Sequence, residues 1–189
     1  MKNVLLIGDS IRMGYDKAVR DALEGRANVI FPEDNCRFAS YVFRYMQDWF
    51  DGIDGKDIDV IHWNAGLHDC LRTFGDEPDT PIEIYEYYIG RICEKMKKLC
   101  PKAKVIFATC TRVIPERMNK NYIRTNQDVL RYNSAAERIV KSHGFRINDL
   151  HALSMTMPDE YLSDAVHYYT PMAQTLFAKQ VLKEIEDVL

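Results

Sequence analysis

Short apolar runs alternate with longer segments of helical periodicity along the chain. The runs predict five strands, at residues 4–7, 29–31, 58–63, 105–108 and 145–147. Strands that alternate with helices are typical of a parallel sheet covered by helices on both faces. The pattern therefore predicts an α/β protein in which the loops after the strands meet at one edge of the sheet.

Two of the helices have clear sequence boundaries. Thr80 is the expected N-cap of a helix with Pro81 in its first turn, and Pro101 stops the same helix. Thr170 and Pro171 predict the start of the last helix in the same way. The segment just before Thr170 is therefore expected to be a loop.

The composition is that of an ordinary globular protein. Apolar residues make up 47% of the 189 residues, charged residues make up 28%, and the net charge is −3. We expect one domain over residues 1–189 with no basic face for nucleic acid. No apolar run has the length of a membrane span or the features of a signal peptide. We therefore expect the protein to be cytoplasmic and to have no membrane partner.

The cysteines argue against disulfides and zinc. They are odd in number and contain no C-x-x-C pair: Cys36, Cys70, Cys93, Cys100 and Cys110. We expect five buried thiols in a reducing compartment.

Ser10 is the first candidate for chemistry. It follows the apolar run 4–7 in the stretch "VLLIGDSIRMGY", and Gly8 permits a tight turn before it. At the start of a helix, its hydroxyl would lie beside backbone N–H groups that can stabilise an oxyanion. The alternative is that Ser10 or Asp9 only caps that helix.

His167 is the candidate base for this serine. Asp164 lies three residues before it in "LSDAVHYYTP", ahead of the last helix. An aspartate at this spacing can accept a hydrogen bond from one imidazole nitrogen and leave the other to take the serine proton. The alternative is a surface histidine beside an unrelated aspartate.

Taken together, Gly8-Asp9-Ser10 and Asp164-x-x-His167 resemble the first and last sequence blocks of the SGNH or GDSL hydrolases. The resemblance implies a flavodoxin-like, three-layer α/β/α fold and an acyl-ester hydrolase with Ser10 as nucleophile and His167 as base. It also implies a small-molecule ester substrate, no metal and no organic cofactor.

The middle blocks depart from that family's pattern. The third block is usually Gly-x-Asn-Asp, with the asparagine helping to hold the oxyanion, whereas this chain has Gly66-Leu67-His68-Asp69. Either His68 or Asn64, at the end of the third strand, could supply the donor, and we favour the neutral amide of Asn64. Gly66 would contribute its backbone N–H.

The second block lacks its usual glycine, so a backbone N–H between Arg37 and Ser40 is expected to serve instead. Arg37 and Arg12 are candidates to receive a polar or anionic part of the substrate. Their alternative is a solvated surface position.

The favoured function is hydrolysis of a short acyl ester, such as an acetyl ester, on a polar body such as a carbohydrate. The polar loop residues behind this choice of substrate are Asp34, Asn35, Arg37, Thr111 and Arg112. Two alternatives remain: acyl transfer to an alcohol by the same residues, and a flavodoxin-like module that binds a small ligand without catalysis.

Overall fold

Five parallel strands form a single sheet in the computed structural model, which describes residues 1–189. The strands are β1 (Lys2–Ile7), β2 (Ala27–Ile30), β3 (Val60–Trp63), β4 (Lys104–Ala108) and β5 (Arg146–Asn148). Their order in the sheet is β2-β1-β3-β4-β5. The chain therefore places β2 on one side of β1, crosses back to place β3 on the other side, and continues outward through β4 and β5. Ligands bind at such a reversal of strand order, and Ser10 follows β1 there.

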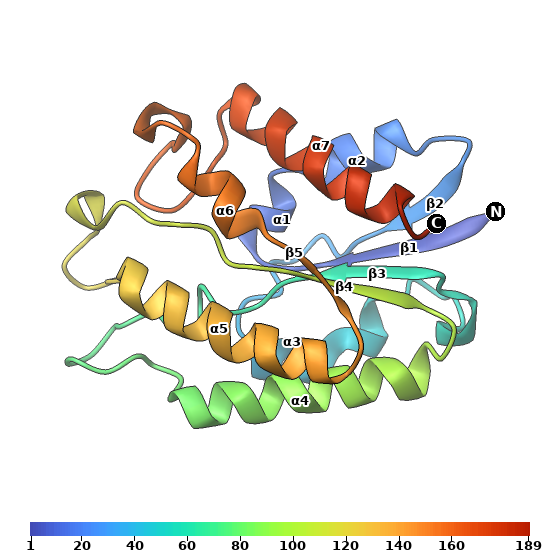
Figure 1. The fold of residues 1–189 in the computed structure, drawn as a ribbon, viewed down its shortest axis with the longest axis horizontal. Helices are drawn as coiled ribbons and strands as arrows, with labels where there is room; N and C mark the ends of the chain where they lie inside the picture. The colour runs from blue at the N-terminus through green and yellow to red at the C-terminus, as the bar shows by residue number, and fades with distance from the viewer.

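Helices cover both faces of this sheet. They are α1 (Ser10–Met13), α2 (Asp16–Ala22), α3 (Ala39–Tyr45), α4 (Ile82–Leu99), α5 (Asn126–Ser142), α6 (Leu150–Met155) and α7 (Pro171–Glu186). The helices α3, α4 and α5 pack together below the sheet, and α1, α2, α6 and α7 lie above it (Figure 1). The strand order and the layers confirm the predicted flavodoxin-like α/β/α sandwich.

The core lies between the sheet and these helix layers. All four residues of β3 are buried, as are the last four of β1. Burial on both faces is expected for a central parallel strand and explains why these strands read as continuous apolar runs. No helix combines the length and apolar character needed to cross a membrane.

The predicted ends of the five strands are correct to within two residues. The third strand begins at Val60 because residues 55–57 form a 3₁₀ turn. Asp59 then accepts a hydrogen bond from the Asn3 backbone at 3.0 Å, which ties the ends of β1 and β3 together. Pro81 is the N-cap of α4, so the prediction of Thr80 as its cap was wrong.

Candidate active site

Ser10 is the first residue of α1, and its hydroxyl does not cap the helix. Asp9 is the N-cap, and its carboxylate accepts a hydrogen bond from the Ile11 backbone N–H at 2.9 Å. The capping role that the sequence offered to either residue therefore belongs to Asp9. The Ser10 hydroxyl is free for another partner.

That partner is His167, which is 157 residues further along the chain. Its Nε2 lies 2.9 Å from Ser10 Oγ, and its Nδ1 lies 2.7 Å from Asp164 Oδ2. Asp164 and His167 occupy the loop before α7, as the Thr170-Pro171 signal predicted. The structure thus brings the three residues together in the order hydroxyl, imidazole, carboxylate, and this arrangement can move a proton from serine to histidine.

Asp164 is held as a carboxylate by its own loop. Its Oδ1 accepts hydrogen bonds from the backbone N–H groups of Val166 at 2.7 Å and His167 at 2.8 Å. Partial burial opposes ionisation, but these bonds and the bond from the imidazole outweigh it and lower the pKa of Asp164 below its ordinary value. The carboxylate can therefore orient His167 across the neutral pH range.

Tyr169 completes the environment of the imidazole, and the sequence reasoning missed it. Its ring stacks on His167, and its hydroxyl donates a hydrogen bond to the Ser10 carbonyl at 3.2 Å. An aromatic residue two positions after the candidate base was its only signal in the sequence.

Asn64 lies against the segment that carries Ser10. It is buried at the end of β3, and its Oδ1 has no hydrogen-bond partner. A Cβ at Gly8 would lie 1.9 Å from that Oδ1, so only glycine at position 8 allows the amide to approach so closely. The Asn64 amide therefore lies against Gly8, which is two positions before Ser10 in the chain.

The loop after β3 is shaped by Gly66 and Asp69. Gly66 has a φ of 144°, and a Cβ there would lie 2.7 Å from the Cys110 sulfur. Both carboxylate oxygens of Asp69 lie 3.1 Å from the Ala39 backbone N–H, which joins this loop to the loop after β2. Burial raises the pKa of Asp69 to about 7.

His68 projects from the same loop and makes no hydrogen bond within the protein. It is half-buried, and burial lowers its pKa, opposed by the negative charge of Asp9 and assisted by the positive charges of Arg124 and Arg37. His68 is therefore a neutral imidazole at neutral pH, able to donate one N–H.

The two candidate arginines differ sharply. Arg12 is fully buried, ion-paired with Asp16, and donates a hydrogen bond to the Asp34 carbonyl at 2.7 Å. It holds the loop after β2 through this bond, so the prediction that it could receive substrate was wrong. Arg37 is exposed at the carboxyl edge of the sheet, has a φ of 51° and forms no ion pair.

The cysteines do not contribute reactive thiols. All five are free and buried, and burial raises the pKa of Cys36 to about 11 and that of Cys70 to about 12. No group of three His, Cys, Asp or Glu side chains is placed to hold a metal ion.

Comparison with known proteins gives a structural match only. No protein-family model matches the chain, and no curated protein matches its sequence. A lipase/acylhydrolase from Enterococcus faecalis superposes with a TM-score of 0.76 at 16% identity, covering 99% of this chain and 96% of that one. The acetyl xylan esterase AlAXEase gives 0.76 at 16% identity, with 97% and 99% covered.

A third structure has the same fold. An acetylxylan esterase from Geobacillus stearothermophilus superposes with a TM-score of 0.71 at 15% identity, covering 97% of this chain and 94% of that one. These matches confirm that the chain has the SGNH/GDSL hydrolase fold.

Proposed function

We propose that the protein is a serine esterase that hydrolyses a short acyl ester of a polar alcohol. The observation that carries the proposal is the continuous line from Ser10 Oγ through the two ring nitrogens of His167 to Asp164, with distances of 2.9 and 2.7 Å. Proton transfer from a nucleophile to a base needs this hydrogen-bond reach.

In the first half of the proposed reaction, Ser10 Oγ attacks the ester carbonyl carbon while His167 Nε2 takes the hydroxyl proton. Asp164 stabilises the imidazolium through Nδ1. The tetrahedral intermediate then expels the alcohol, which receives the proton from His167. The acyl group remains on Ser10.

The negative oxygen of the intermediate needs donors near Ser10. The Ser10 N–H is at the first position of α1, where a helix offers no internal acceptor, and the Gly66 N–H donates to no group in the protein. The Asn64 amide is the third candidate. Each such donor contributes about 3 kcal/mol to the transition state in comparable sites.

In the second half, His167 takes a proton from water, and the resulting hydroxide attacks the acyl-Ser10 carbonyl. The acid leaves, and the proton returns to Ser10 Oγ. If an alcohol replaces water at this step, the same residues perform acyl transfer, so hydrolysis and transfer differ only in the acceptor.

An acetyl group is the proposed acyl portion, supported by the acetyl xylan esterases among the structural matches. The polar-loop argument for a carbohydrate is weaker than the sequence indicated. Thr111 is buried, and the Arg112 guanidinium is engaged by the Ser154 and Met157 carbonyls at 3.1 and 2.7 Å.

The test is hydrolysis of 4-nitrophenyl acetate together with labelling by a fluorophosphonate probe. The native protein is expected to be labelled and active, and Ser10→Ala is expected to abolish both. His167→Ala is expected to lower kcat by at least about 10³-fold. The matched control is Ser134→Ala, at an exposed position of α5, which should behave as the native protein does.

A native protein that neither turns over esters nor reacts with the probe would contradict the proposal and favour the non-catalytic binding module. A loss of less than about tenfold in His167→Ala would remove this histidine from the role of base. Adding glycerol or a monosaccharide and analysing the products separates transfer from hydrolysis.

A further inference from the structure

Arg124 is half-buried at the carboxyl edge of the sheet, and no carboxylate lies within ion-pair distance of its guanidinium. Its Nε donates a hydrogen bond to the Leu67 carbonyl. Two carboxylates act on it without pairing with it: Asp9, which caps α1, and Asp79, which Thr73 engages through two bonds of 2.9 Å. The terminal nitrogens of Arg124 therefore have no protein acceptor.

The terminal nitrogens are not fully enclosed, so a ligand can reach them, and an anionic acceptor would offset the cost of the partial burial. Taking a guanidinium out of water without a partner loses hydration that only hydrogen bonds to an acceptor can replace. Burial lowers the pKa of Arg124, although the group remains a cation at neutral pH. Arg12, which is fully buried, forms an ion pair with Asp16, whereas Arg124 forms no ion pair.

Arg37 and His68 share this location. Arg124 binds the carbonyl of Leu67, the neighbour of His68 in the chain. Asp69, on the other side of His68, binds the backbone of Ala39, two residues after Arg37. Arg124, His68 and Arg37 thus belong to three different loops, and these two hydrogen bonds hold the loops together.

These loops lie beside the candidate nucleophile. They follow β2, β3 and β4, and Ser10 follows β1, which lies between β2 and β3 in the sheet. The charges of Asp9, Arg124 and Arg37 all act on the His68 ring, which is consistent with one shared cluster.

From these contacts we propose that the substrate carries an anionic group, a carboxylate or a phosphate, that binds between Arg124, Arg37 and His68. The inference rests on the proposed esterase function and specifies its substrate class. The planar guanidinium of Arg124 presents two parallel N–H donors to such a group. His68 adds a neutral N–H donor, and Arg37 adds a second positive charge at the solvent side.

The test compares matched neutral and anionic esters. On the acyl side, 4-nitrophenyl acetate is compared with mono-4-nitrophenyl succinate. On the alcohol side, methyl 4-acetoxybenzoate is compared with 4-acetoxybenzoate and with 4-acetoxyphenyl phosphate. The native protein is expected to prefer at least one anionic ester by about tenfold or more in kcat/KM, as charge-assisted hydrogen bonds would give.

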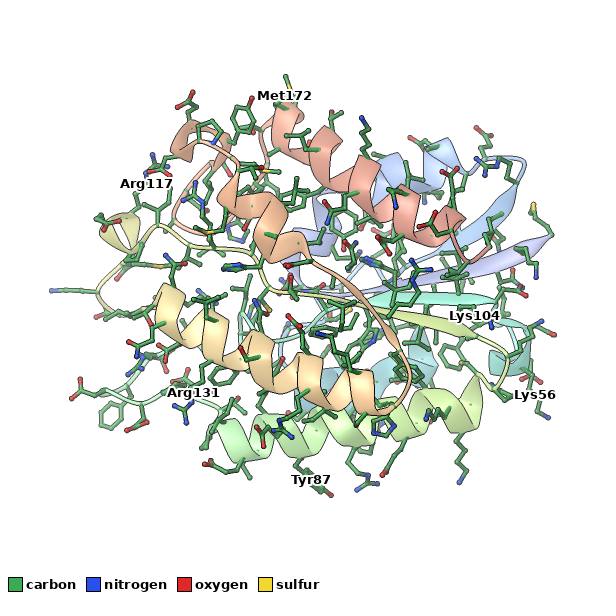
Figure 2. The ribbon with its side chains drawn as sticks, viewed as in Figure 1. Lys56, Tyr87, Lys104, Arg117, Arg131 and Met172 are labelled. Carbon is green, nitrogen blue, oxygen red and sulfur yellow. The ribbon has the colours of Figure 1, made fainter.

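Arg124→Gln and Arg37→Gln are expected to lower this anionic-to-neutral ratio, mainly through KM, by about tenfold for Arg124 and less for the exposed Arg37. Arg124→Lys keeps the charge without the planar fork, so it should restore only part of the ratio. The control is Lys104→Gln, which removes one positive charge at the amino end of β4. Figure 2 shows Lys104 at the opposite end of the molecule from Arg117, which follows β4.

The failures are distinguishable. Ser10-dependent hydrolysis with no anionic preference, or a preference that Arg124→Gln and Arg37→Gln leave intact, would overturn the inference and leave the esterase function standing. If no ester is hydrolysed, the inference is tested by anion binding, followed by NMR. Succinate or phosphate should shift the ring proton resonances of His68 in the native protein and not in Arg124→Gln. No shift in the native protein would overturn the inference.

Discussion

The ring of Tyr169 stacks on the imidazole of His167, with centroids 4.9 Å apart and planes inclined by 20°. The Tyr169 hydroxyl also donates to the Ser10 carbonyl at 3.2 Å. One side chain therefore touches both the candidate base and the backbone of the candidate nucleophile. Because His167 sits in a loop, this contact restricts its ring to the orientation that faces Ser10 Oγ.

We expect Tyr169→Ala to lower kcat for 4-nitrophenyl acetate by about tenfold or more with a small change in KM, since a misplaced base slows proton transfer. Tyr169→Phe keeps the stacking and should recover most of the rate. The control is Tyr87→Ala, which removes an exposed tyrosine on α4. A Tyr169→Ala protein with native kcat would show that Asp164 alone orients His167.

Asn64 and His68 are expected to differ in their effect on the oxyanion. Asn64→Ala should lower kcat for a neutral ester by about 10²-fold, the loss typical of one oxyanion donor. His68→Ala should cause a smaller loss for the same ester, because its proposed partner is the anionic part of the substrate. The reverse order of the two losses would assign the oxyanion contact to His68.

Gly8→Ala is expected to destabilise the fold and reduce activity together. Its new Cβ would lie 1.9 Å from Asn64 Oδ1 and 2.8 Å from Arg12 Cβ, so both must move. Overpacking of this kind costs about 1–3 kcal/mol in the free energy of unfolding, measured by urea denaturation.

Gly90→Ala is the matched control for that substitution. Gly90 lies within α4, and its nearest new contact would be Ile139 Cγ2 at 4.0 Å. The control should gain up to about 1 kcal/mol from the helix preference of alanine. Equal stability of the two variants would refute the crowding argument at Gly8.

Asp69 is expected to make stability depend on pH. Because its pKa is raised to about 7, the folded state holds a proton that the unfolded state loses near pH 4. Its contribution to the free energy of unfolding therefore falls as pH rises from about 4 to 7 and is constant above that range.

In Asp69→Asn this dependence disappears, so the stability of the variant relative to the native protein should increase from pH 5 to pH 8, on the order of a few kcal/mol. His62, whose pKa burial lowers to about 3, acts with the opposite sign but is present in both proteins. A difference that does not change with pH would mean that Asp69 is ionised throughout.

The element order and the local part of the site could be predicted from the sequence. The apolar runs set the strands, because buried parallel strands need apolar residues on both faces. Asp164 and His167 are three residues apart, so short-range backbone bonds suffice to bring carboxylate and imidazole together. The position of Ser10 after β1 followed from the same local pattern.

Which polar groups meet across the sheet was decided only by the tertiary structure. Arg12 and Arg124 have the same side chain in different surroundings. Arg12 is buried and ion-paired with Asp16, whereas Arg124 forms no ion pair and donates to the Leu67 carbonyl. Asp16 is four residues from Arg12 in the chain, but the contacts of Arg12 with the Asp34 carbonyl and of Arg124 with the Leu67 carbonyl depend on loops that are distant in the chain. The sequence alone determined the strand order along the chain and the local Asp164–His167 pair; the packing of β1 between β2 and β3 determined what surrounds Ser10.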